Sequence, residues 1–164
     1  MKSKMNKHFE DEFPWLGMDG TAVKKDLLRH YHLTLGRDKS VCAENYLFQA
    51  AALTVRDRLV ERWRSTRENY RIAKPRRVAY LSLEYFMGRA FSNAVLNLDL
   101  EAPVENALSS FGCAFEEIVE QERDPGLGNG GLGRLACYLI YLMLGLQVLL
   151  EYQSDQQYSG KPCI

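Results

Sequence analysis

The residues best placed to do chemistry lie in a glycine-rich stretch, Asp124 to Leu135, which reads DPGLGNGGLGRL. Five of the eight residues from 126 to 133 are glycine. Glycine takes positive φ at no steric cost and lets a ligand approach the main chain. Because the following segment has a helical pattern, we expect the N–H groups of Gly130, Gly131 and Leu132 to be first-turn donors at a helix N-terminus. Such termini bind phosphate and other anions.

The alternative is that these glycines only shape a tight loop and let a helix pack closely. Neither common phosphate motif fits the stretch. No Lys-Ser/Thr pair follows the glycines, as it would in a Walker loop, and the stretch is not well placed as a dinucleotide fingerprint. The residues of the loop alone leave both interpretations open.

A strand is predicted upstream of the loop. Residues 77–83 form a nearly continuous apolar run that is typical of a short buried strand. Glu84 follows at the carboxyl end, where open α/β sheets bind their ligands. From the residues alone, the Glu84 carboxylate either pairs with Arg89 or faces a sugar.

Helical periodicity predicts most of the remaining structure. We expect a helix capped by Thr21 that ends at Gly36, and a long amphipathic helix from Ala43 to about Ile72 that ends before Lys74-Pro75. Three shorter helices are expected at about residues 90–98, 103–111 and 115–123, the last with a solvated acidic face. His30 and His32 lie two apart on a helix and so point to different faces, which argues against a metal site.

Three sequence words resemble the N-terminal domain of the glycogen and starch phosphorylases. They are the glycine stretch, RVAYLSLEYFMGRAFSN at Arg77 to Asn93, and LTVRDRLVERW at Leu53 to Trp63. The resemblance covers roughly Leu33 to Cys137, with the words in the expected order and spacing. It implies an α/β fold: part of the N-terminal Rossmann-like domain of a two-domain glycosyltransferase of the GT-B type, helix-rich in this chain. The implied reaction is phosphorolysis of terminal α-1,4-linked glucose, which releases glucose 1-phosphate.

The resemblance assigns roles to individual positions. Gly130 and Gly131 would present main-chain N–H groups to the substrate phosphate, as preset donors where negative charge moves. Asn129 and Leu132 would line the glucose pocket, and Glu84 would lie at its edge.

The resemblance also implies pyridoxal 5'-phosphate as cofactor. In the family it is held as a Schiff base on a lysine of the C-terminal domain, and its phosphate group exchanges a proton with the substrate phosphate. That domain is missing here, so we expect this chain to be inactive alone. The implied partners are α-glucan, inorganic phosphate and a second subunit of a homodimer. Arg134 matches a family arginine and is expected to brace the loop, and Phe86 stands where some relatives have tyrosine.

The far end of the long helix is strongly basic. One interpretation, which assigns no function, is that these residues form a solvated helix face. The other interpretation assigns a function: an anion pocket, which the resemblance places at part of an effector site. The candidate residues are Trp63, Arg67, Tyr70 and Arg71. Arg71 stands where an effector-stacking tyrosine is expected, which argues against nucleotide activation.

The resemblance breaks off after Cys137, where the chain continues YLIYLMLGLQVLLEYQSDQQYSGKPCI. Such an abrupt break is typical of a frame change, a retained intron or a truncated gene model. We therefore predict a partial phosphorylase domain over residues 21–137 and a divergent tail over residues 138–164. Before the domain, we predict a mobile arm over residues 1–20 that is anchored through Phe13 and Trp15. The apolar run at Leu135 to Leu150 is too short for a membrane span.

Composition narrows the function classes. The formal net charge is zero, which favours neither nucleic acid nor membrane as a partner. The four cysteines lack CxxC spacing and are expected to be free thiols in the cytoplasm. Two alternatives to the enzyme remain: a short non-catalytic regulator that docks on full-length phosphorylase, and a nucleic-acid binder that uses the basic helix.

Overall fold

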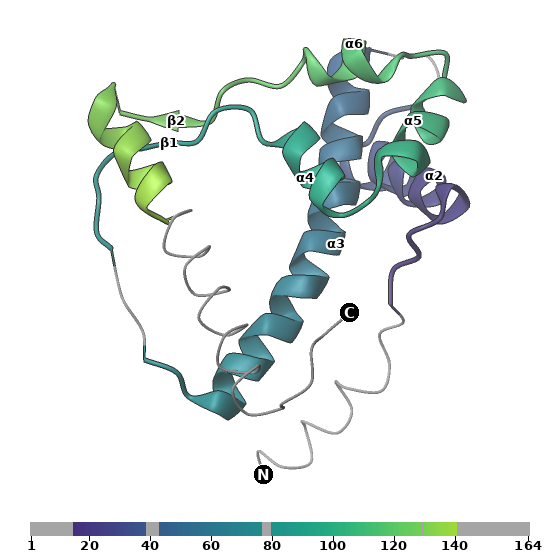
Figure 1. The fold of residues 1–164 in the computed structure, drawn as a ribbon. Helices are drawn as coiled ribbons and strands as arrows, with labels where there is room; N and C mark the ends of the chain where they lie inside the picture. Colours follow the sequence, from purple (N-terminus) through teal and green to yellow (C-terminus); the bar gives the residue numbers. More distant parts are fainter. Residues whose placement is uncertain (1–14, 39–42, 77–79, 129, 141–164) are drawn as a thin grey trace, which may run out of the picture. The chain divides into compact units, whose positions relative to one another are not determined.

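The computed structural model describes residues 15–38, 43–76, 80–128 and 130–140. The chain divides into two compact units (Figure 1). Unit 1 combines residues 1–75 with residues 91–122, and unit 2 combines residues 76–90 with residues 123–164. The long helix belongs to unit 1, and the glycine-rich loop belongs to unit 2.

Helix α2 (Gly20–Arg29) opens the described part of unit 1. The prediction that Thr21 caps this helix is wrong, because the cap is Asp19. The Asp19 carboxylate accepts hydrogen bonds from the main-chain N–H groups of Thr21 and Ala22, both at 3.2 Å, and from the Thr21 hydroxyl. The Thr21 side-chain bond holds the pKa of Asp19 below its ordinary value. An aspartate two residues earlier reaches the same orphan donors and adds a negative charge that the helix dipole favours.

A single π-helical segment, η1 (His30–Thr34), continues α2 directly. The His30 ring is buried, with Nδ1 3.0 Å from Thr34 Oγ1 and Nε2 3.0 Å from Asp57 Oδ2. His32 is exposed, and its Nδ1 lies 2.8 Å from the Arg37 carbonyl. The two histidines therefore have different surroundings, as their spacing predicts.

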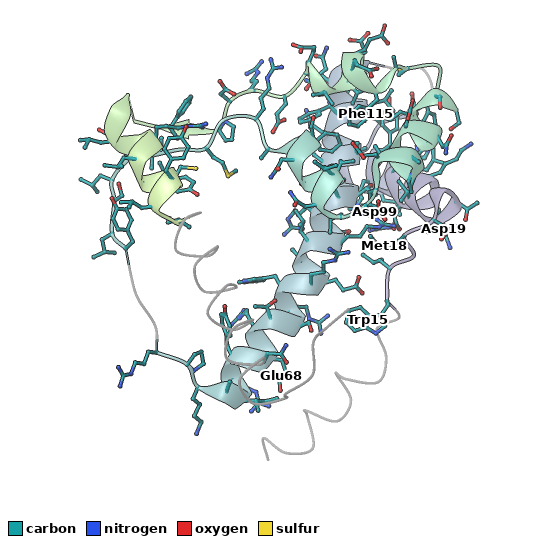
Figure 2. The ribbon with its side chains drawn as sticks, viewed as in Figure 1. Trp15, Met18, Asp19, Glu68, Asp99 and Phe115 are labelled. Carbon is teal, nitrogen blue, oxygen red and sulfur yellow. The ribbon has the colours of Figure 1, made fainter. Side chains whose placement is uncertain are left out.

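Helix α3 (Glu44–Ala73) agrees closely with the predicted long helix. It ends where Lys74 takes a left-handed conformation at φ 48°, directly before Pro75. The first half of α3 packs into the core, and its second half, from residue 61 on, is mostly exposed. Figure 2 shows Phe115 near the N-terminal end of α3 and Glu68 on the far half.

Three short helices complete unit 1: α4 (Phe91–Asn97), α5 (Glu101–Ser109) and α6 (Phe115–Val119). With α2 they gather around the first half of α3 (Figure 1). Their apolar faces meet in one core, whose fully buried members include Leu27, Val55, Val95, Leu108 and Ile118. The predicted acidic surface of α6 is exposed at Glu116 and Glu117. Glu122 beyond it is different, because its carboxylate accepts the Phe91 N–H at 3.1 and 3.2 Å and so caps α4.

The segment before α2 is held by its backbone. Trp15 is 74% exposed, so the expectation that it anchors the arm is wrong, and Phe13 lies outside the described residues (Figure 2). Instead, the Leu16 N–H donates to the Glu61 carboxylate at 3.1 Å. The Gly17 carbonyl accepts from the Arg58 guanidinium.

Unit 2 is built on a two-stranded antiparallel ribbon. Strand β1 (Tyr85–Phe86) pairs with β2 (Gly126–Leu127), with Phe86 opposite Gly126. A helix begins at residue 131 and includes residues 131–140. The buried strand predicted at 77–83 is wrong over its described part, since residues 80–84 are irregular and Leu81 and Leu83 are 93% and 94% exposed. A buried parallel strand needs neighbours on both sides, and the described residues supply none there.

Over its described residues the fold is thus helix-rich with one small sheet, in agreement with the helix-rich chain predicted from the sequence. In the part of the chain that the structure describes, no helix combines the length and apolar character needed to cross a bilayer.

Candidate functional site: the glycine loop of unit 2

Two sequence motifs separated by about forty residues meet in unit 2. The β1–β2 pairing joins the SLEYFMGR segment to the start of the glycine loop. The loop then turns through Gly128 and Gly130, both with positive φ, and enters the helix. The Arg134 N–H donates to the Gly130 carbonyl at 3.4 Å, which is the first hydrogen bond of that helix.

The predicted loop-to-helix arrangement is therefore present. Because Gly130 accepts the first helical bond, Gly131, Leu132 and Gly133 occupy the first turn, whose N–H groups have no acceptor within the helix. These donors, together with the helix dipole, give the loop a positive electrostatic character. Asn129, which the sequence places in the same turn, lies outside the described residues.

The glycine positions of the loop differ in the physical reason that excludes a side chain. Three pack closely on the other motif. A Cβ at Gly128 would lie 2.5 Å from Glu84 Cγ and one at Gly126 would lie 2.8 Å from the Phe86 ring, so either would force a shift, and one at Gly133 would make a tight contact with Phe86 at 3.3 Å. Gly130 is required by its φ of +85°. Gly131 is the exception.

Gly131 has neither reason to be glycine within the described structure. Its φ is not in the left-handed region, and nothing lies within 4 Å of where a Cβ would be. A glycine in a helical turn costs about 0.5–1 kcal/mol relative to alanine. The open space over its main chain is the feature of this loop that suits an approaching ligand.

Glu84 lies across the loop, with its side chain packed on Gly128. One of its carboxylate oxygens, Oε2, is buried and has no hydrogen-bond partner among the described residues. The pairing with Arg89, one of two interpretations open from the sequence, is not among the observed ion pairs of those residues. A buried carboxylate oxygen without a donor costs free energy, which a donor from a ligand would recover.

The predicted effector residues belong to unit 1, on the exposed half of α3. The Arg67 guanidinium carbon lies 4.8 Å from the centre of the Trp63 ring, a cation–π contact that covers one face of the ring. Arg71 forms an ion pair with Glu68, and this hydrogen bond lowers the pKa of the Glu68 carboxyl. Tyr70 is half-buried.

Among the described residues, no group of three His, Cys, Asp or Glu side chains could hold a metal ion. Cys113 and Cys137 are free thiols. The sequence singled out Phe86 only as the counterpart of a tyrosine in some relatives, and it did not predict that Phe86 and Met87 contact the loop through packing and a main-chain carbonyl. The sequence pattern that could have predicted this role of Phe86 is an aromatic residue in the SLEYFMGR motif together with several glycines in the GLGNGGLGRL motif, against which an aromatic ring can pack closely.

Comparisons with known proteins agree with the motifs. Residues 108–147 match the family model of carbohydrate phosphorylase. The chain is 47% identical over 122 residues to the brain form of glycogen phosphorylase from Homo sapiens, an alignment that covers 74% of this chain and 14% of the relative. It is 48% identical over 120 residues to the muscle form from Oryctolagus cuniculus, covering 73% of this chain and 14% of the relative.

The chain spans about one-seventh of the length of these curated relatives. The family match runs past Cys137 to residue 147, and the boundary of a divergent tail at residue 138 stays a prediction. The resemblance drawn from the sequence words is confirmed, because about three quarters of this chain is similar to glycogen phosphorylases, at 47–48% identity. The chain therefore carries a segment of the carbohydrate phosphorylase family.

Proposed function

We propose that the glycine loop of unit 2 binds a phosphate or sugar-phosphate group through the main-chain N–H groups of Gly130 and Gly131. The observation that carries the proposal is the open space at Gly131, whose lack of a side chain nothing else in the described chain explains. The first-turn donors supply the positive end of the site. Leu132, 69% exposed, and Asn129 would line an adjoining sugar pocket.

Glu84 supplies the complementary chemistry in this proposal. Its unpartnered Oε2 accepts a hydrogen bond, and a sugar hydroxyl is a donor of the kind it needs. A site with main-chain donors on one side and a carboxylate acceptor on the other suits a ligand that carries both an anion and hydroxyl groups. A sugar phosphate meets both requirements.

At the level of the whole protein, the proposed reaction is phosphorolysis of terminal α-1,4-linked glucose in glycogen or starch. The supporting observation is the identity to glycogen phosphorylases. The same relationship supports the finer proposals: a Rossmann-like GT-B domain, an allosteric homodimer, a cytoplasmic enzyme, and α-glucan and inorganic phosphate as substrates. In this reaction the loop would hold and orient phosphate, with donors set in place before charge develops.

Pyridoxal 5'-phosphate does not fit the residues present. The sequence has no lysine between Lys74 and Lys161, so the described part of unit 2 offers no amine for a Schiff base. The group would have to be held by other parts of a longer protein. No step of the proposed loop chemistry depends on it.

The loop proposal predicts a separation of stability from binding in one variant. Gly131→Ala is expected to leave the free energy of unfolding unchanged or to raise it by up to about 1 kcal/mol, because alanine suits a helical turn. The same methyl group obstructs the open space and is expected to weaken phosphate binding about tenfold or more, the loss of one charge-assisted hydrogen bond. Amide chemical shifts of the 15N-labelled chain, titrated with inorganic phosphate, measure both the site and its affinity.

The control titration replaces phosphate with chloride at the same ionic strength. In the original chain, phosphate should shift the amides of Gly131 and Leu132 and leave those of α5 in place. Equal shifts with chloride, or none with phosphate, would overturn the anion site. An unchanged affinity in Gly131→Ala would show that the open space has no role in binding.

A second prediction concerns the chain by itself. Because it spans one-seventh of its relatives and the described part of unit 2 offers no lysine, we expect it neither to take up pyridoxal 5'-phosphate covalently nor to release glucose 1-phosphate from glucan. The measurement is an absorbance band that borohydride reduction removes, alongside a phosphorolysis assay with a full-length phosphorylase as positive control. A reducible band or turnover would refute the expectation.

A further inference from the structure

Two contacts of Arg134 show how this arginine, which the sequence predicts to brace the loop, could do so. It follows Gly133 in the first turns of the helix at 131–140, and its Nη1 donates to the Met87 carbonyl at 2.9 Å. Its guanidinium carbon also lies 4.8 Å from the centre of the Tyr138 ring, one turn further along the same helix. A cation near a helix N-terminus is disfavoured by the dipole, so this placement needs a compensating purpose.

The contact partner of Arg134 belongs to the other motif. Met87 follows β1 directly, and Gly88 after it makes a turn with φ +81°. Gly133, the neighbour of Arg134, is buried and packs on the same segment, since a Cβ there would lie 3.3 Å from both Phe86 N and Phe86 Cβ. Two consecutive residues of the helix start are thus fixed to the β1 segment, one by close packing and one by a hydrogen bond.

We propose that Arg134 is a positioning residue that sets the direction of the first-turn N–H groups of the glycine loop by tying the helix start to the Met87 carbonyl. The functional meaning of this role rests on the proposed anion binding by Gly130 and Gly131. The structural part does not, because the tie between the two motifs exists whatever the loop binds.

The two contacts explain why the residue is arginine. The guanidinium is planar and carries several donors, so one N–H can donate to the Met87 carbonyl while the charged group lies over the Tyr138 ring. Lysine can donate to the carbonyl but cannot stack in the same way. Methionine has a stem of similar length and provides neither the charge nor the donor.

The test compares Arg134→Met and Arg134→Lys with a matched control, Arg123→Met. Arg123 is an exposed arginine of the same unit, so its replacement removes the same charge. Native-state amide exchange of the 164-residue chain is expected to speed up about tenfold or more at residues 135–137 in Arg134→Met, because the helical hydrogen bonds of these amides depend on a fixed helix start. Arg134→Lys should show a smaller increase, Arg123→Met none, and the α5 amides of unit 1 should be unchanged in all three.

The second readout is the phosphate titration followed at Gly131 and Leu132. A role limited to stability would leave the affinity of the folded loop unchanged, whereas a positioning role predicts weaker binding in Arg134→Met and partial recovery in Arg134→Lys. Should the original chain show no phosphate shift, the proposed function fails, and the exchange rates still test the tie. Exchange in Arg134→Met equal to that in Arg123→Met, or equal damage in Arg134→Lys and Arg134→Met, would overturn the proposal.

Discussion

Replacing Arg58 with methionine is expected to lower the free energy of unfolding of unit 1 by about 3–5 kcal/mol, the usual cost of removing one partner from a buried charge pair. Arg58 is 1% exposed. Its guanidinium donates to the Gly17 carbonyl at 2.5 and 3.1 Å, to the Thr54 carbonyl at 3.0 Å and to the Asp26 carboxylate at 3.0 Å. Methionine keeps much of the apolar stem but leaves all three acceptors without this donor. Urea unfolding followed by far-UV circular dichroism measures the loss.

Arg56→Met is the matched control for this measurement. The Arg56 side chain is 65% exposed, and its only described ion pair is with Asp57 at 3.4 Å. Exposed pairs contribute about 0–1 kcal/mol, so the control should change little. A loss in Arg58→Met within about 0.5 kcal/mol of the control would show that the buried network is not what holds residues 15–19 and α2 to α3. Replacing Asp26 with leucine as well should recover part of the loss, because it removes a half-buried carboxylate that then keeps only its ion pair with Arg29 at 3.5 Å.

Replacing Gly128 with alanine is expected to destabilise unit 2 by about 2–5 kcal/mol, because strain and a steric clash act together. The φ of Gly128 is +86°, a region that costs a side chain about 1–2 kcal/mol. The new Cβ would lie 2.5 Å from Glu84 Cγ and 3.0 Å from Glu84 Cβ. These atoms are close to the backbone, so the glutamate cannot avoid the methyl group by moving its tip alone. Amide exchange at residues 135–137, in the helix of unit 2 that follows the loop, measures the loss.

Two further variants separate the strain from the clash. Gly130 has nearly the same φ, +85°, and nothing within 4 Å of its Cβ position, so Gly130→Ala should show the strain alone. Gly128→Ala in a Glu84→Ala background should approach the cost of Gly130→Ala, because most of the clashing side chain is gone. Additive effects of Glu84→Ala and Gly128→Ala would contradict the packing across the loop, since residues in contact are expected to couple.

These variants separate the loop glycines by the physical reason for which each position lacks a side chain. Gly126, Gly128 and Gly133 accommodate Phe86 and Glu84, and Gly130 makes a turn. Only Gly131 is left without a reason inside the described chain. The two interpretations that the sequence left open, a tight loop and an anion site, therefore apply to different glycines of one stretch.

The sequence by itself determined the elements that depend on local interactions. Helix α3 was predicted from Ala43 to about Ile72 and is observed as Glu44–Ala73, because helical hydrogen bonds join residues four apart and the apolar spacing repeats within the segment. The Lys74-Pro75 end followed from the same local reasoning. The family relationship also came from local words, GLGNGGLGRL and SLEYFMGR, whose identity needs no tertiary contact to recognise.

Only the tertiary structure decided which residues those elements bring together. The strand predicted at 77–83 failed over its described residues because a strand depends on partners that the sequence pattern does not name. Arg58 could not be told from the exposed arginines around it, since its burial results from Gly17 and Asp26, which lie 41 and 32 residues away. The roles of the loop glycines, likewise, were fixed by side chains from about forty residues upstream. In each case the deciding interaction joins residues far apart in the chain. A single sequence shows the types of these residues but not which of them meet.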